Sequence, residues 1–420
     1  MGSREWGVGV EGVQENLPTT NYQLPILIMS RPIYLDCHST TPLDERVLQA
    51  MSPYFREHFG NPSSNSHVYG WEAEAGVRQS REILAGAIAA TPEEIVFTSG
   101  ATEANNLAIK GVAEAYFQKG RHIITLVTEH NAVIDPSEYL RSLGFEVTFL
   151  PVQTDGLIDL EKLAQAFRPD TILVSVMAAN NEIGVLQPLA EIGKMCRDRQ
   201  VLFHTDAAQA IGKTPLDVEA MQIDLMSLTA HKVHGPKGIG ALYVRRRNPR
   251  VQLAPQLHGG GQERGMRSGT LYTPQIVGFG QAVAIALAER ETETKRQIQL
   301  RDRLWQKLSQ LDGVYLNGHP SLRLPGNLNI SVEGVDGTAL HLGLQPVVAV
   351  SSGAACSSAK TAPSHVLIAL GRSEQLAYAS IRFGIGRFNT VEEIDRVAEH
   401  AVATISSLRR QKQLSVTCYQ

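Results

Sequence analysis

Three short stretches of this 420-residue chain place polar side chains directly after an apolar run. The first, residues 97–106, turns through small residues into a helical pattern, and the unpaired N–H groups of such a helix N-terminus can bind a phosphate. The second run ends at Asp206, whose buried carboxylate would suit a cationic partner such as a protonated pyridine nitrogen. The third ends near Lys232, and a desolvated lysine can act as a Schiff-base nucleophile.

Each stretch also has an ordinary structural explanation when it is taken alone. The small residues of 97–106 and the carboxylate of Asp206 are typical helix N-caps, and a single lysine usually lies on the surface. Lys237, in the Gly/Pro turn that follows, is a rival for Lys232. Together the three stretches predict a pyridoxal phosphate site, because that cofactor needs a phosphate cradle, an acidic partner for its ring nitrogen and an amine.

The elements that would hold these residues alternate between strands and helices. Seven apolar or β-branched runs predict strands at 95–97, 122–127, 146–150, 171–177, 201–204, 224–228 and 240–244. Helical patterns lie between them at 103–118, 136–143, 160–167 and 189–199. This order is typical of a mostly parallel sheet that is covered on both faces and binds ligands at the carboxyl ends of its strands.

Beyond residue 280 the pattern changes to that of a second, smaller α/β domain. A long helix with alternating charge is predicted at 284–311, followed by a strand at 327–332 and a final helix at 391–410. We therefore expect an uncertain lead-in at 1–28 and a large cofactor-binding domain at 42–285. The small domain would consist of residues 29–41 and 286–420.

Composition and charge exclude several other classes of protein. Apolar residues make up 43% of the chain and charged residues 19%, as in an ordinary globular protein. The net charge of −3 gives no global electrostatic reason to bind nucleic acid or an anionic membrane. No run approaches the roughly 18 apolar residues of a membrane span, and four scattered cysteines form no disulfide framework. We therefore expect a cytoplasmic protein. We expect no metal site, because His231 and His234 lack a third ligand at zinc-like spacing.

The motifs along the chain resemble those of the cysteine desulfurases, which are pyridoxal phosphate enzymes of the aspartate-aminotransferase-like class (fold type I). The resemblance covers about residues 33–408 and rests on motifs at 99–103, 128–130, 180–184, 206–209, 231–232, 259–270, 352–356 and 380–383. It implies an α/β fold with a mostly parallel seven-stranded sheet in the large domain and the catalytic cysteine loop in the small one. It also implies conversion of L-cysteine to L-alanine, with sulfur passing to acceptors such as an iron–sulfur scaffold or to other thiolation.

The same resemblance assigns cofactor contacts to single residues. Lys232 would form the Schiff base, Asp206 would pair with the ring nitrogen, and His130 would stack on the ring and carry protons. The resemblance also places Asn181 and Gln209 near the ring, at its phenolic oxygen. The phosphate contacts would come from Ala101, Thr102, Thr229 and His231.

The remaining roles concern substrate, sulfur and assembly. Arg382 would bind the substrate carboxylate, with Asn181 beside it, because a planar guanidinium suits that group. Cys356 would take the sulfur as a persulfide. Thr270 resembles a residue that reaches the cofactor phosphate of the neighbouring subunit, which implies a homodimer.

Two positions depart from the family's Asp-x-x-Ala-Thr-Thr motif, and other enzymes remain as alternatives. Ser39 replaces the alanine, and Cys37 adds a thiol that we expect to be buried rather than redox-active. A selenocysteine lyase or another β-eliminating enzyme could use the same scaffold, because a selenol leaves without attack by a thiol. An aminotransferase would have no use for Cys356, and a non-catalytic scaffold would be expected to lack it.

Overall fold

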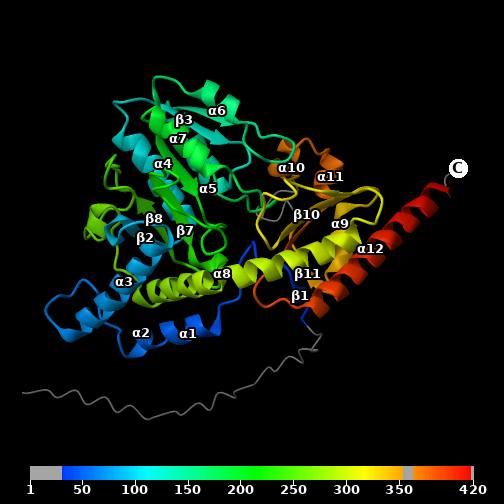
Figure 1. The fold of residues 1–420 in the computed structure, drawn as a ribbon, viewed down its shortest axis with the longest axis horizontal. Coiled ribbons are helices and arrows are strands. Elements are labelled where there is room, and N and C mark those ends of the chain that lie inside the picture. Colours follow the sequence, from blue (N-terminus) through cyan, green and yellow to red (C-terminus); the bar gives the residue numbers. More distant parts are fainter. Residues whose placement is uncertain (1–30, 353–362, 418–420) are drawn as a thin grey trace, which may run out of the picture. The chain divides into compact units, whose positions relative to one another are not determined.

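A central sheet of seven strands has the order β2-β8-β7-β6-β5-β3-β4 (Figure 1). The computed structural model describes residues 31–352 and 363–417, so Cys356, Cys418 and the predicted lead-in lie outside the described residues. The strands are β2 (Ile95–Thr98), β3 (His122–Leu126), β4 (Glu146–Leu150), β5 (Thr171–Ser175), β6 (Leu202–Asp206), β7 (Leu225–Thr229) and β8 (Gly240–Val244). β8 runs antiparallel to both of its neighbours, β2 and β7, and the other neighbouring strands of this sheet are parallel to one another. The seven predicted strands and the mostly parallel sheet are therefore confirmed.

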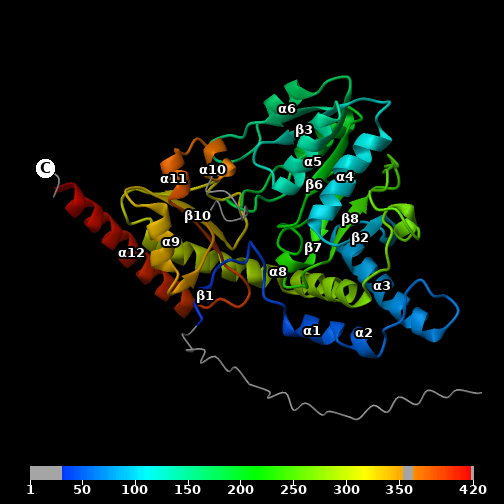
Figure 2. The ribbon, with the colours of Figure 1, turned by 180° about the vertical axis from the view of Figure 1, so that it is seen from behind.

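Helices cover both faces of the sheet. Successive strand residues point to opposite faces, and apolar residues on each face pack against helices. Val96 of β2 packs in one hydrophobic cluster with α4 (Ala101–Ala115) and α5 (Asn131–Ser142). Ile95 and Phe97 belong to the cluster on the other face, with α3 (Val68–Ala87), α6 (Leu160–Ala166), α7 (Leu189–Asp198) and the first half of α8 (Thr273–Leu308). Figure 2 shows α4 in front of the strands, whereas α7 is in front in Figure 1.

Two of the predicted helix starts were wrong. α5 begins at Asn131 rather than at Pro136, because the His130 side chain caps the helix and the proline lies inside it. α8 begins at Thr273 rather than at residue 284, and Pro274 occupies its first turn, where a missing N–H breaks no helical bond. Both errors came from placing the first residue of the helix by its local composition.

The chain after α8 builds a smaller, three-stranded antiparallel sheet in the order β12-β10-β9. These strands are β9 (Val314–Leu316), β10 (Asn327–Val332) and β12 (Ser380–Gly384), while β1 (Ile33–Tyr34) and β11 (Val348–Ala349) pair separately. The other helices are α1 (Glu45–Met51), α2 (Pro53–Arg56), α9 (Gly337–Leu344), α10 (His365–Ala369), α11 (Glu374–Tyr378) and α12 (Val391–Thr417). Among the described helices, none is long and apolar enough to cross a membrane.

The second half of α8 packs against this smaller sheet. Leu300, Leu304 and Leu308 share a hydrophobic cluster with β10, β12 and α12. The predicted boundary at residue 285 therefore falls inside one continuous helix. The described residues from Pro32 onward form a single compact unit, and their division into two domains stays a prediction.

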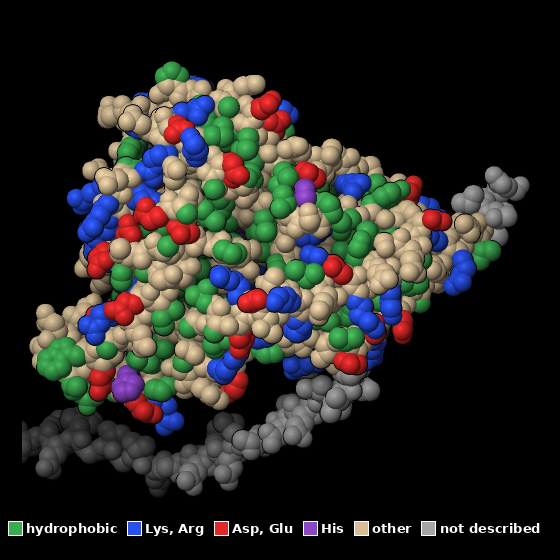
Figure 3. All heavy atoms as spheres, viewed as in Figure 1, with side chains coloured by type: hydrophobic (Ala, Val, Ile, Leu, Met, Phe, Trp, Pro, Cys, Tyr) green, Lys and Arg blue, Asp and Glu red, His purple; other side chains and the backbone are tan. Residues whose placement is uncertain are grey.

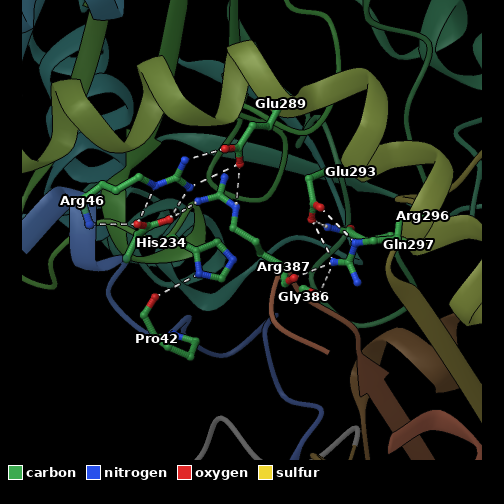
Figure 4. Close-up of polar contacts among 10 residues, drawn as sticks. Pro42, Arg46, His234, Glu289, Glu293, Arg296, Gln297, Gly386 and Arg387 are labelled. Carbon is green, nitrogen blue, oxygen red and sulfur yellow. Dashed lines mark hydrogen bonds and ion pairs between the residues drawn. The ribbon is translucent and has the colours of Figure 1, made fainter. Parts of the chain in front are cut away.

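A network of ion pairs joins α1, α8 and the loop after β12 (Figure 4). Asp44 caps α1 and accepts hydrogen bonds from Arg46 at 2.8 Å and from Arg387 at 2.7 Å. Glu289 of α8 pairs with both arginines, at 2.6 Å and 3.3 Å respectively. The hydrogen bonds from Arg46 hold the pKa of Asp44 well below its usual range. The network fixes the segment just before α1 beside the end of β12.

Candidate active site

A cavity of about 620 Å³ lies at the carboxyl ends of β2, β3, β5, β6 and β7. Its size suits a small-molecule cofactor. The predicted site residues that line it are Ala101, Thr102, His130, Asn181, Asp206, Gln209, Thr229, His231, Lys232 and Arg382. Thr270 is exposed and does not line the cavity, and Cys356 lies outside the described residues. Lys237, the rival of Lys232, lines it too.

The first turn of α4 presents backbone N–H groups at the end of β2. Gly100 precedes the helix, and Ala101 and Thr102 are its first residues. The first N–H groups of a helix have no partner within it and therefore bind anions. Gly240 of β8 lets this turn come close, because a Cβ at that position would lie 2.7 Å from the Gly100 backbone. The arrangement forms a phosphate cradle of the predicted kind.

Asp206 ends β6 with its carboxylate almost fully buried; 6% of the residue is exposed. Its Oδ2 accepts a hydrogen bond from Asn105 Nδ2 at 2.7 Å, and its Oδ1 accepts one from the Ala208 N–H at 2.9 Å. Sequence reasoning did not single out Asn105. Its position four residues after Ala101, on the same face of α4, was the available signal.

Lys232 follows β7 in a 3-10 turn, and its amine is held by the segment before α1. Nζ donates to the backbone carbonyls of His38 at 2.5 Å and Ser39 at 2.6 Å. Gln209 contacts the same segment, because its Nε2 donates to the His38 carbonyl at 2.7 Å. Gln209 thus lines the cavity with its amide already bonded, and its contact with a cofactor oxygen stays a prediction.

His130 is the N-cap of α5 and faces the cavity. Its Nδ1 accepts a hydrogen bond from the Ala132 N–H at 3.0 Å, so the neutral ring carries its proton on Nε2. Burial lowers the pKa of His130, although the carboxylate of Asp206 opposes this effect. The ring can therefore donate a hydrogen bond from Nε2, whereas proton uptake at Nδ1 would break the helix cap.

Arg382 of β12 reaches the cavity from the smaller sheet and is 3% exposed. Its Nη1 donates to the carbonyl of Asn181 at 2.9 Å. Its Nη2 donates to Asp36 Oδ1 at 2.8 Å and to Ser39 Oγ at 2.6 Å. Asp36 was not predicted as a site residue, and Ser39 was noted only as a departure from the family motif.

Both ends of the segment 353–362, which carries the predicted nucleophile, are fixed beside the cavity. Before it, the carbonyl of Ser351 accepts the backbone N–H of Arg382 at 2.8 Å. After it, the Ser364 hydroxyl donates to Glu182 Oε2 at 2.5 Å, and Glu182 follows the cavity residue Asn181 in the chain. The chain thus enters and leaves this segment next to the predicted substrate site.

The two cysteines within the described residues are buried, as expected for Cys37. Cys37 is 6% exposed and Cys196 is fully buried, and both are free. Burial raises the pKa of the Cys37 thiol to about 12, so it is protonated and unreactive at neutral pH.

The donor set of the cavity fits pyridoxal phosphate. The N-terminus of α4 would hold the phosphate, Asp206 would pair with the ring nitrogen, and Lys232 would supply the amine. These three groups come from different strands and meet at one edge of one sheet.

Comparisons with known proteins agree with this geometry. The aminotransferase class-V family model matches residues 33–397. The mitochondrial cysteine desulfurase of Arabidopsis thaliana is 55% identical over 390 residues, which cover 93% of this chain and 86% of the relative. The cysteine desulfurase IscS of Neisseria meningitidis is 54% identical over 383 residues, covering 91% and 94% of the two chains.

Solved structures show the same fold. A NifS-like protein superposes with a TM-score of 0.83 at 38% identity, covering 90% of this chain and 100% of that one. The protein SspA, solved in complex with cysteine, gives a TM-score of 0.76 at 38% identity and covers 85% and 100%. The fold and the site therefore define a pyridoxal phosphate enzyme of fold type I in the class-V aminotransferase family. Within that family the chain belongs to the cysteine desulfurases.

Proposed function

We propose that this enzyme binds L-cysteine between Lys232 and Arg382 and passes its sulfur to Cys356, leaving L-alanine. The observation that carries the proposal is the anchoring of both ends of segment 353–362 at the rim of the cavity. Cys356 is the fifth residue after Ser351, and five residues can span up to about 17 Å. Its thiol therefore has the reach to meet a substrate held by Arg382.

The proposed steps assign one task to each residue. Arg382 holds the substrate carboxylate, and the amine of Lys232 takes the proton from Cα. Pyridoxal phosphate, when bound, withdraws electrons from that carbon. The Cys356 thiolate attacks the substrate sulfur, an S–S bond forms, and the Cβ–S bond breaks with its electron pair left on carbon. That carbon takes up a proton to become the methyl group of alanine, so the step needs no external oxidant.

The test measures alanine and sulfide released from L-cysteine by the cofactor-loaded enzyme with a thiol reductant present. We expect equal amounts of both products from the wild type and from the control variant Cys418→Ser. The variant Cys356→Ser should release neither and should still bind the cofactor. Alanine release at the wild-type rate from Cys356→Ser would overturn the role of Cys356. A wild type that acts on selenocysteine alone would point to a lyase instead.

We also propose a homodimer in which Thr270 of one subunit reaches the cofactor phosphate of the other. In support, Thr270 is exposed, and Tyr272 nearby is 50% exposed with its ring 6.3 Å from that of Phe55. Further exposed aromatic residues near α2 and α3 are Phe59, Tyr69 and Trp71. Figure 3 shows hydrophobic side chains gathered over this end of α3, at the lower left. Exposed aromatic clusters of this kind are typical of protein interfaces.

The destination and location of the sulfur chemistry are proposals as well. We propose that the persulfide passes to an acceptor protein such as an iron–sulfur scaffold, which the resemblance supports. A cytoplasmic location is supported by Cys37 and Cys196, two free thiols that suit a reducing compartment.

A further inference from the structure

We propose that the hydroxyl of Ser39 competes with the substrate carboxylate for the guanidinium of Arg382 and so lowers the affinity for L-cysteine. The inference rests on the proposed role of Arg382 in binding that carboxylate. It makes Ser39 a positioning residue that acts through Arg382.

The N–H groups of Arg382 are largely in use already. A guanidinium binds a carboxylate with two parallel hydrogen bonds along one of two edges, either Nε with Nη2 or Nη1 with Nη2. Both edges therefore need Nη2. In this structure Nη2 serves two acceptors, Asp36 Oδ1 at 2.8 Å and Ser39 Oγ at 2.6 Å. A substrate carboxylate can therefore accept two hydrogen bonds from Arg382 only when it displaces one of these acceptors from Nη2.

The edge of Arg382 that contains Nε has a donor available for a ligand. The Nε of Arg382 is buried and has no hydrogen-bond partner among the described residues. An unpaired buried donor is costly, and a carboxylate oxygen would satisfy it. On the edge formed by Nε and Nη2, the Nε–H is therefore available to a carboxylate, whereas Nη2 still donates to Asp36 and Ser39.

Of the two acceptors, Ser39 is the one that a substrate carboxylate displaces more easily. Asp36 and Arg382 form an ion pair, and such a charge-assisted bond is stronger than a bond to a neutral hydroxyl. Its Oδ1 also accepts the Ser351 hydroxyl at 2.8 Å. The Ser351 hydroxyl has one hydrogen, and it donates this hydrogen to Asp36. The Ser39 hydroxyl therefore donates its own hydrogen to Ser351 Oγ, 3.2 Å away. The Ser39–Ser351 bond can remain when the Arg382 guanidinium leaves Ser39 and binds a substrate carboxylate.

The hydroxyl and the backbone carbonyl of Ser39 make different contacts. The Ser39 carbonyl accepts a hydrogen bond from Lys232 Nζ at 2.6 Å. Replacing the side chain by alanine leaves this carbonyl in place, so the contact with Lys232 is kept. The variant therefore tests the hydroxyl alone.

The experiment compares Ser39→Ala with the wild type in two measurements. We expect KM for L-cysteine to fall by about 3–10-fold, with the change in KM rather than in kcat. The Kd for L-alanine, which carries the carboxylate but no thiol, should fall by a similar factor in calorimetry without turnover. The affinity for cysteamine, which lacks the carboxylate, should stay unchanged. Ser39→Thr keeps a hydroxyl and should keep the wild-type KM.

Controls separate this inference from the proposed function. Ser309→Ala, at the exposed end of α8, should leave every constant unchanged. Arg382→Ala should raise the Kd for L-alanine strongly; if it does not, the proposed role of Arg382 is wrong. If Arg382→Ala has this effect but Ser39→Ala leaves the Kd unchanged or raises it, the competition is rejected and the proposed function stands.

Discussion

At the scale of the residue, His130 has separate roles in the helix and in the cavity. Its Nδ1 caps α5, while its ring faces the proposed cofactor. Asparagine can replace the cap but not the ring. We expect both His130→Asn and His130→Ala to lower the rate of alanine release by about 100-fold or more. Only His130→Ala should also lower the free energy of unfolding, by about 1 kcal/mol, in urea titrations.

The two variants together distinguish the roles of His130. Equal destabilisation by both substitutions would show that the ring stabilises the protein by packing rather than by capping. A normal rate in His130→Asn would remove the ring from the proposed chemistry. Intact cofactor binding, followed by visible absorbance, is checked first in each variant.

Residues next to an apolar run could be predicted, and those that act across the chain could not. Asp206 and Lys232 stand at strand ends, so the sequence places them at the carboxyl edge of the sheet. Asp36 contacts Arg382 across 346 residues of sequence, and no local sequence pattern predicts that contact. The same holds for Ser39, which sequence reasoning could mark as unusual without saying what it touches.

At the scale of the element, a line of side-chain hydrogen bonds crosses three adjacent strands of the sheet. His204 of β6 bonds to Ser175 of β5 at 2.8 Å and to Ser227 of β7 at 3.0 Å. The histidine is fully buried, and burial lowers its pKa to about 3. The neutral imidazole therefore links strands that backbone bonds already pair.

This line predicts a pH dependence of stability. In the unfolded chain the pKa of His204 returns to about 6.5, so between pH 6.5 and 3 the unfolded state binds more protons. Stability is then unaffected above pH 6.5 and falls as the pH drops, by up to about 1.4 kcal/mol per pH unit from this group. Urea unfolding at pH 7 and pH 5 should show a smaller difference for His204→Asn than for the wild type. The exposed His258→Asn is the control, and an unchanged difference in His204→Asn would contradict the prediction.

Elements with large apolar side chains were predictable, and those built from small residues or short strands were not. The buried face of α3 is mostly Gly, Ala and Ser, including Gly70, Ala73 and Gly76, so its hydrophobic pattern is weak. β1 and β11 are two residues each and form only because they pair with each other. Tertiary contact rather than local propensity decides such elements.

At the scale of the whole molecule, α8 takes part in both hydrophobic cores. Ile276 and Phe279 pack against the seven-stranded sheet, and Leu300 and Leu304 pack against the smaller one. Composition predicted two regions of different character, because the texture changes near residue 280. Composition could not show that one continuous helix packs against both sheets, because the sequence of the helix has no distinct pattern where it passes from one sheet to the other.

The proposed dimer gives a prediction at the same scale. Trp71 is 56% exposed, and near it the rings of Phe59 and Tyr69 lie 5.4 Å apart. We expect Trp71→Glu to shift the mass in light scattering from twice the 45.8 kDa chain toward the single chain. The physical reason is that a carboxylate buried in an apolar interface has no partner there. The fold should survive, because the position is exposed in the single subunit.

The same variant should release its cofactor more readily, because Thr270 of the neighbouring subunit would no longer reach the phosphate. Leu143→Glu is the matched control: Leu143 is 54% exposed and follows α5, which packs beside β4, the strand at the opposite edge of the sheet from β2. It should keep both the dimer mass and the cofactor. A monomeric wild type would contradict the shared site, and a dimeric Trp71→Glu with normal cofactor affinity would move the interface away from the aromatic residues near α2 and α3.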